Sequence, residues 1–360
     1  MVIEIVTSLR YNYLINNERS AARHRNTGMK LDKLFCDGIV FAEEKPVRVF
    51  GEGEEKVAVR LCGAEAEAAS SNGRWVAELP PMSAGGPYEL EVTCGGVTEI
   101  IKDVYIGKVY LVAGQSNAEF QLNSSSEPKS DYKDDGLLRN FFVRRPWFEG
   151  DPFDPGEGWL PAKTGSVGAW SAIAYLAGRE TRRLTNKAVG VITCAQGASI
   201  IESWLPRDAA RVFTLSKEKL MADHFDPEYS AWNKDGVIFD EMLSKLFPFS
   251  LNGVIWYQGE SDTTTYEGEI YDEELLRFIK TVREGVFDPA LPFAVIQIAD
   301  YDGRREDDPD GWTSIQAAQE RAVGRDANAS LIVSKDVCES GYIHPTKKTE
   351  LSIRAAKALV

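Results

Sequence analysis

The stretch Val109-Tyr110-Leu111-Val112-Ala113-Gly114-Gln115-Ser116-Asn117 is an apolar run that ends abruptly at a polar turn. Residues 109–113 have the length and the β-branched content of a buried strand. A Gly-x-Ser step directly after such a strand lifts the serine hydroxyl out at the strand's carboxyl end. Most Gly-x-Ser triplets are ordinary turns, so the step alone is a weak signal. It nevertheless makes Ser116 the candidate nucleophile of the chain.

A serine nucleophile needs a base, and histidine is the usual one because its unperturbed pKa lies near neutrality. The chain has three histidines. His24 lies in a polar, arginine-rich stretch and His224 in an acidic one, which indicates surface or loop positions for both. His344 lies in a loop between a predicted strand at 331–333 and a predicted final helix at 351–359. We therefore predict that His344 is the base.

Strands and helices alternate along the C-terminal two thirds of the chain. Predicted strands lie at 109–113, 188–193, 253–257, 293–298 and 331–334, and predicted helices at 169–184, 272–286 and 315–324. This alternation is typical of a parallel sheet with helices on both faces and active groups at the carboxyl ends of the strands. The sequence therefore predicts an α/β fold with a three-layer, doubly wound parallel sheet. The segments 124–160 and 205–236 are predicted to be loops along the same edge, because Asp, Pro, Ser and aromatic residues are frequent there.

Residues 31–103 have a different sequence pattern, in which segments of alternating apolar and polar residues are separated by short turn clusters. The alternating segments are 46–51, 56–61, 73–79 and 87–93. Short strands at this spacing predict a small antiparallel β-sandwich. We therefore predict two domains: a sandwich-like one at 1–103, which begins with an irregular leader, and a catalytic one at 104–360.

The composition argues against several classes of partner. The 360 residues carry a formal net charge of −14, which would repel a nucleic acid or an anionic membrane. No apolar stretch reaches membrane-spanning length. Neither a His-Glu-x-x-His motif nor a cysteine spacing typical of metal ligands is present. We therefore expect no metal and no other cofactor, and the sequence leaves open whether the chain forms a homo-oligomer.

Cysteine usage favours a reducing compartment. The five cysteines, at positions 36, 62, 94, 194 and 338, include no Cys-x-x-Cys pair. An odd number of isolated cysteines in apolar runs indicates reduced core residues. The first residues also lack the basic region and apolar core of a signal peptide. Both observations favour a cytoplasmic location, and a secreted mature form whose signal peptide has been removed stays open.

A set of short segments stands out along the chain: Leu34-Phe35-Cys36-Asp37-Gly38-Ile39-Val40 with Pro46-Val47, Gly73-Arg74-Trp75, Leu79-Pro80-Pro81-Met82, Gly114-Gln115-Ser116-Asn117, Gln196-Gly197-Ala198-Ser199-Ile200-Ile201-Glu202-Ser203-Trp204, Trp256-Tyr257-Gln258-Gly259-Glu260-Ser261-Asp262 and Ile343-His344-Pro345. In this order they resemble the sialate O-acetylesterase group of the SGNH hydrolase superfamily, which is close to acetyl xylan esterases. The resemblance extends from about Leu31 to the end of the chain. Any one segment could arise by chance, whereas the ordered set is a specific signal.

The resemblance implies a role for particular residues. Ser116 corresponds to the family's nucleophile and His344 to its base. The oxyanion hole would consist of the backbone N–H groups of Ser116 and Gly197 and the side-chain amide of Gln258. Such preorganised donors stabilise the tetrahedral oxyanion of ester hydrolysis by roughly 3 to 4 kcal/mol each. Predicted substrate contacts are Gln115, Asn117 and Trp204.

The chain departs from the family's pattern beside the base. Many superfamily members carry an aspartate three positions before the catalytic histidine, where it orients the ring, but this chain has Gly341 there. The orienting acid must come from elsewhere or be absent. Our first candidate is Glu260, because the resemblance to related xylan esterases implies that the glutamate of this turn is the acid. The second candidate is Asp336, on the loop before His344.

These features favour a metal-independent serine esterase that removes O-acetyl groups from a carbohydrate, with sialic acid the favoured substrate and acetylated xylan the alternative. An α/β-hydrolase is disfavoured because the turn at 114–118 lacks the second glycine of the nucleophile elbow. A non-catalytic carbohydrate-binding protein is the alternative of another class, and the joint presence of Ser116, Gln258 and His344 disfavours it. Candidate walls for a sugar ring are Trp147, Phe148, Trp159, Trp204 and Trp232.

Overall fold

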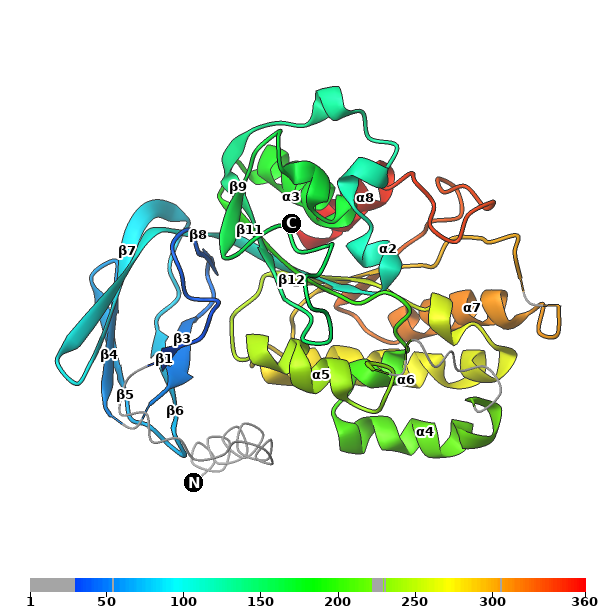
Figure 1. Cartoon of the computed structure of the whole chain (residues 1–360), viewed down its shortest axis with the longest axis horizontal. Coiled ribbons are helices and arrows are strands. Elements are labelled where there is room, and N and C mark those ends of the chain that lie inside the picture. The colour runs from blue at the N-terminus through cyan, green and yellow to red at the C-terminus, as the bar shows by residue number, and fades with distance from the viewer. Residues whose placement is uncertain (1–29, 54, 222–228, 230, 305) are drawn as a thin grey trace.

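The computed structural model describes residues 30–53, 55–221, 229, 231–304 and 306–360. In this part of the chain, a β-rich lobe formed by the N-terminal strands lies beside a larger lobe in which helices cover a central sheet (Figure 1). The predictions for the N-terminal leader, for His24 and for His224 lie outside the described residues.

The central sheet of the larger lobe confirms the predicted α/β class. Its strands lie in the order β10-β9-β11-β8-β12-β13-β14. The strands are β8 (Val97–Gly114), β9 (Asp135–Phe142), β10 (Trp159–Ala162), β11 (Val189–Ala195), β12 (Gly253–Tyr257), β13 (Phe293–Ile296) and β14 (Ala329–Ile332). All neighbours pair in parallel except β10, which runs antiparallel to β9 at the edge. The carboxyl ends of the parallel strands therefore meet at one edge of the sheet.

Helices lie on both faces of this sheet, with α3 and α8 on one side and α5, α6 and α7 on the other (Figure 1). The helices are α2 (Ser116–Glu119), α3 (Ala172–Thr185), α4 (Arg207–Met221), α5 (Val237–Glu241), α6 (Thr265–Gly285), α7 (Gly311–Gly324) and α8 (Thr349–Leu359). Successive residues of β8 point to opposite layers, since Tyr110 and Val112 belong to the apolar core under α3 and α8. Val109 and Leu111 belong instead to the core that contains the α6 side chains. A strand that is buried on both faces reads as a continuous apolar run, as β8 does.

Two segments that we predicted to be loops contain regular structure. Residues 124–160 include β9, and residues 205–236 include α4, so both predictions were wrong in part. The polar residues Arg139 and Asn140 are buried within β9 and interrupt its apolar pattern. Arg139 is accommodated there because its guanidinium donates to three backbone carbonyl oxygens. The α4 sequence is amphipathic, so its helical pattern was present in the sequence and was missed.

The N-terminal lobe is built of antiparallel strands, as the alternating sequence predicts. Its strands are β1 (Lys30–Leu31), β2 (Val40–Ala42), β3 (Val47–Glu52), β4 (Val57–Leu61), β5 (Ala64–Ala68), β6 (Arg74–Leu79) and β7 (Gly85–Cys94). One sheet has the order β1-β3-β6, and the other pairs β5 with β4, β4 with β7, and β7 with the first part of β8. Alternate residues are buried along β4 and β6, which places one face of each sheet in the apolar core. The short β2 pairs in parallel with β8.

The two lobes share a strand and a packed interface. β8 runs without interruption from the N-terminal lobe into the central sheet, so the predicted boundary at 103/104 falls inside a strand. Arg48 of β3 is buried and donates to the Val286 carbonyl oxygen at 2.8 Å. Lys45 forms a 2.7 Å ion pair with Asp288. The boundary itself remains a prediction.

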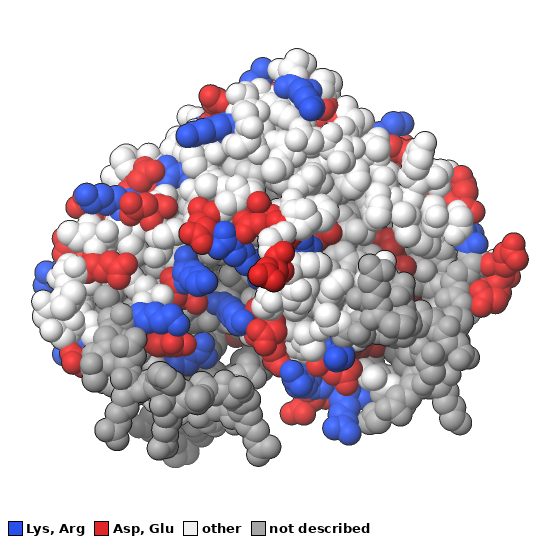
Figure 2. Space-filling model, in the orientation of Figure 1, with Lys and Arg blue, Asp and Glu red and all other residues white. Residues whose placement is uncertain are grey.

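Charged side chains of both signs are interspersed over the face that Figure 2 shows, on the described part of the chain. Within the described residues, none of the helices combines the length and the apolar character needed to cross a bilayer.

Candidate active site

Ser116 lies on the turn where β8 ends and α2 begins. Gly114 has a φ of +139°, and a Cβ at this position would overlap the Tyr257 carbonyl oxygen, so the turn requires glycine. The Gln115 N–H donates to the same carbonyl oxygen at 3.0 Å, which ties the turn to the end of β12. The turn therefore presents the Ser116 side chain at the carboxyl edge of the sheet.

The structure brings Ser116 and His344 together. The His344 Nε2 atom lies 2.8 Å from the Ser116 Oγ atom, although the two residues are 228 positions apart. Partial burial lowers the pKa of His344, and the nearby Lys348 charge lowers it further. A neutral imidazole is the form that can accept the serine proton. The pair therefore has the geometry expected of a nucleophile and its base, and the lowered pKa of His344 favours the neutral imidazole.

Neither candidate acid hydrogen-bonds to the His344 ring within the described residues. Glu260 is buried at 7% exposure, and its Oε1 atom accepts a hydrogen bond from the Asn117 side chain. Burial raises the pKa of Glu260, while the hydrogen bond from Asn117 acts in the opposite direction. Asp336 lies at the surface, where both carboxylate oxygens accept from Arg354, at 2.8 and 2.7 Å. Arg354 of α8 therefore occupies the Asp336 carboxylate, and the prediction that Asp336 orients His344 was wrong.

Gly197 lies opposite the nucleophile. A Cβ at this residue would lie 3.6 Å from the Ser116 Cβ atom and 2.9 Å from the Glu119 Oε1 atom. The Gly197 N–H donates to Glu119 Oε2 at 3.1 Å, and the same carboxylate oxygen accepts from Arg145 at 2.8 Å. Arg145 is itself buried and bound by the Asp151 carboxylate. Burial raises the pKa of Glu119, while Arg145 and the Gly197 N–H act in the opposite direction.

Two residues predicted to line the site are in the core instead. Gln258 is 0% exposed, and its amide donates to the Ser199 carbonyl oxygen and to Asp262. Its amide oxygen accepts from the Tyr271 hydroxyl at 2.7 Å. Those contacts use the donors and the acceptor of the amide and leave none for an oxyanion, so the assignment of Gln258 to the oxyanion hole is corrected.

Trp204 is also 0% exposed, and its ring packs edge-on against Trp256 with the centroids 5.4 Å apart. It therefore cannot contact a substrate, and that prediction was wrong. Gln115 and Asn117 are buried as well, at 2% and 1% exposure. The Gln115 Oε1 atom accepts the backbone N–H groups of Gly259 and Ser261, so its side chain braces the neighbouring turn rather than facing solvent.

Aromatic side chains gather next to the Gly197 turn. The Trp147 Nε1–H donates to the Gln196 Oε1 atom at 2.8 Å, and the Trp147 and Trp232 rings lie 5.9 Å apart. Phe148 is 38% exposed, and its ring lies 5.7 Å from that of Trp232. Of the other candidate walls for a sugar ring, Trp159 is buried at 4% exposure in the apolar core.

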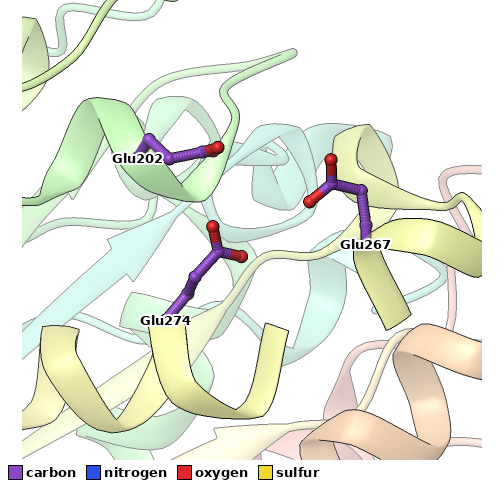
Figure 3. Close-up of side chains that lie close together, drawn as sticks. All are labelled: Glu202, Glu267 and Glu274. Carbon is purple, nitrogen blue, oxygen red and sulfur yellow. The ribbon is translucent and has the colours of Figure 1, made fainter. Parts of the chain in front are cut away.

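Three buried carboxylates, Glu202, Glu267 and Glu274, point toward one another from η4 (Ile201–Trp204) and α6, as Figure 3 shows. One oxygen from each lies within 4.8 Å of the others. Carboxylate oxygens suit a hard divalent cation, but acidic clusters are common without one. Each of these residues has an interaction partner in the folded chain. The expectation that no metal takes part in catalysis therefore remains a prediction.

The model of one protein family matches residues 106–360, which include the whole candidate site. That family is described as carbohydrate esterase, sialic acid-specific acetylesterase. This chain belongs to that family. The resemblance inferred from the short segments is thereby confirmed.

The curated relatives that match this chain are sialate O-acetylesterases. The chain is 26% identical to the mouse sialate O-acetylesterase over 334 residues, which cover 78% of this chain and 61% of the mouse protein. It is 24% identical to the human sialate O-acetylesterase, covering 84% of this chain and 62% of the human protein. The chain therefore spans about three fifths of the length of these curated relatives. A crystal structure of a carbohydrate acetylesterase from Xanthomonas citri superposes with a TM-score of 0.77 at 28% identity, covering 92% of this chain and 74% of that one.

In this member of the sialic acid-specific acetylesterase family, sequence reasoning missed Glu119, Arg145 and Lys348. Glu119 follows the nucleophile by three residues, so its place on the same helical turn was available from the spacing. Lys348 follows His344 by four residues, but nothing local distinguishes a buried lysine from a solvated one. No local signal exists for Arg145, which reaches the site from a different segment.

Proposed function

We propose that this chain is a serine esterase that removes O-acetyl groups from carbohydrates, with O-acetylated sialic acid as the favoured substrate. The observation that carries the proposal is the 2.8 Å contact between Ser116 Oγ and His344 Nε2. Membership of a carbohydrate esterase family and the names of the mouse and human relatives support it. No step of the proposed reaction requires a metal or another cofactor.

In the proposed first half-reaction, the Ser116 oxygen attacks the acetyl carbonyl carbon while His344 Nε2 accepts the serine proton. The tetrahedral intermediate then collapses, the bond to the sugar oxygen breaks, and the imidazolium returns its proton to that oxygen. The acetyl group is left on Ser116 as an ester. In the second half-reaction His344 deprotonates a water that attacks this ester, acetate leaves, and the serine hydroxyl is restored.

The proposed oxyanion donors are the backbone N–H groups of Ser116 and Gly197. Gly197 faces the Ser116 side chain, which supports its part in this role. Its N–H is donated to Glu119, so the oxyanion has to replace one carboxylate oxygen at this donor. The Arg145 guanidinium, which also binds Glu119, can retain the displaced carboxylate. Because the oxyanion forms only when the carbonyl carbon is attacked, the cost of that exchange is part of the activation barrier.

The substrate would approach beside the Gly197 turn. Phe148 and the half-buried Trp147 offer apolar ring faces, and Trp147 is linked to that turn through Gln196. Aromatic faces pack against the C–H surface of sugar rings. This arrangement supports a carbohydrate leaving group, while the choice between sialic acid and xylan rests on the family and the relatives.

The proposal extends to fold, domains and location. The parallel strand order and the helices on both faces support the three-layer, doubly wound arrangement of SGNH hydrolases. The change from antiparallel to parallel pairing along β8 supports a division near residues 103 and 104. The cysteines at 36, 62, 94, 194 and 338 are all unpaired thiols, which favours the cytoplasm.

Turnover of 4-nitrophenyl acetate by the purified chain, with Ser116→Ala as the control, tests the esterase. We expect hydrolysis by the wild-type chain that is lost in the variant. A panel of O-acetylated sialic acids and acetylated xylo-oligosaccharides, assayed side by side, then ranks the substrates. A folded chain that binds these glycans but hydrolyses no ester would instead be a carbohydrate-binding protein. Faster release of acetate from xylo-oligosaccharides would reassign the substrate and keep the reaction.

A further inference from the structure

Lys348 has an unusual place for a lysine. It is the residue directly before α8 and lies four residues after the base. It is 0% exposed. Lysine is almost never fully buried unless its ammonium group has partners. Its Nζ atom donates to the Asn117 Oδ1 atom at 2.6 Å and lies 5.0 Å from the ring centroid of Tyr257 and 5.1 Å from that of Phe120. The Phe120 ring in turn lies 6.2 Å from the ring of His344.

The NH₂ end of the Asn117 amide connects the turn that carries Ser116 to two further segments. Its Nδ2 atom donates to Glu260 Oε1 at 2.5 Å and to the Ile343 carbonyl oxygen at 3.0 Å. A flipped amide would turn its NH₂ group toward the Lys348 ammonium and its oxygen toward two acceptors. A cation on one side and two acceptor oxygens on the other therefore select one orientation of this amide. In that orientation, the residue after the nucleophile holds the backbone just before the base.

We propose that Lys348 is a positioning residue for the base: its buried ammonium group orients the Asn117 amide, which ties the His344 loop to the turn that carries Ser116. The inference rests on the proposed function, because it assigns a purpose to the geometry of that pair. It also explains how His344 keeps its place although no carboxylate among the described residues contacts its ring. Glu260 acts at one remove, as the hydrogen-bond acceptor that holds the far side of Asn117.

The same ammonium group biases the protonation of the base. Burial lowers the pKa of Lys348 to about 8, and Cys338, Glu260 and Glu339 are the titratable groups that face it and oppose that effect. Lys348 is therefore mostly protonated at pH 7. Its charge contributes, after burial, to the lowered pKa of His344. Loss of this charge should raise the pKa of His344 and move the acid limb of kcat/KM to higher pH.

The test compares Lys348→Met, which is one atom shorter and removes charge and donor, with Lys348→Gln, which keeps an N–H donor. Lys347→Met is the matched control, because that neighbouring lysine has an exposed side chain. The readouts are kcat and KM on 4-nitrophenyl acetate, thermal unfolding, and an NMR titration of the His344 ring, whose signal is assigned by its loss in His344→Gln. The titration requires no turnover, so it reports on the inference even if the chain hydrolyses no ester.

We expect Lys348→Met to lower kcat by about tenfold to a hundredfold with little change in KM, since a base displaced by a fraction of an ångström loses alignment. Its His344 titration should move to higher pH. Lys348→Gln should recover part of kcat and show the same shift in titration, and Lys347→Met should match the wild type. Unchanged kcat and an unchanged His344 titration in folded Lys348→Met would overturn the inference. If Lys348→Met does not fold, the same two measurements on Lys348→Gln decide it: an unmoved titration overturns the inference.

Discussion

Gly197→Ala places a single methyl group between the nucleophile and the carboxylate that binds the Gly197 N–H. The new Cβ atom would lie 2.9 Å from Glu119 Oε1, about 0.5 Å closer than ordinary van der Waals contact allows. The carboxylate is held by Arg145 at 2.8 Å and by the Gly197 N–H at 3.1 Å, so it cannot move away without lengthening one of them. The methyl group would also lie 3.6 Å from the Ser116 Cβ atom, in the space that the acetyl group has to enter.

A displacement of this size at a reacting centre costs about tenfold to a hundredfold in rate, and we expect that loss in kcat/KM on 4-nitrophenyl acetate. Thermal unfolding should change little, because the strained contact is with the end of a side chain rather than with backbone. Gly324→Ala is the matched control, since a Cβ at that position meets nothing within 4 Å. A folded Gly197→Ala enzyme with the kcat/KM of the wild type would refute the placement of Gly197 at the reacting carbonyl.

Three further predictions concern the base, the nucleophile and the core. Ser116→Ala and His344→Ala should each lower kcat by about three orders of magnitude. The kcat of the double variant should be no lower than that of either single variant, because the two residues act as a unit. Additive losses in the double variant would contradict the pairing. The value of kcat/KM should fall as the pH drops through the pKa of His344, because the protonated imidazole cannot act as a base. Since burial and Lys348 lower that pKa, the acid limb should lie below pH 6.5, the ordinary pKa of histidine. An acid limb above pH 6.5 would show that burial and the Lys348 charge do not lower the pKa of His344. Gln258→Ala should destabilise the fold by about 1 to 3 kcal/mol, because it removes a buried amide that hydrogen-bonds to other buried groups, and a denaturant titration measures this. A lower kcat without loss of stability would return Gln258 to the oxyanion hole.

Features that depend on a few consecutive residues could be predicted from the sequence. The strand that ends at Gly114 follows from an apolar run and a glycine whose φ no other residue adopts without strain. His344 was identified by elimination among three histidines and by its loop context. The structure places it against Ser116, because both follow elements whose ends meet at one edge of the sheet.

What the sequence could not determine is which of the polar residues near that edge face the substrate. Gln258, Gln115 and Trp204 stand in the same motifs as the reacting groups, yet all three are buried. Burial depends on segments that arrive from far along the chain, and no local period encodes it. Lys348 meets Asn117 across 231 positions, for example.

The sequence by itself therefore determined the α/β class and the antiparallel N-terminal strands, and it pointed to the proposed nucleophile and base, since each follows from local backbone preference or from residue type. Only the tertiary structure decided that Glu119 binds the Gly197 N–H, that Asp336 pairs with Arg354, and that the buried Lys348 donates to Asn117. The physical reason is that hydrogen bonds and charges act over a few ångströms. Their partners are set by the packing of distant segments, which the order of residues along the chain does not display.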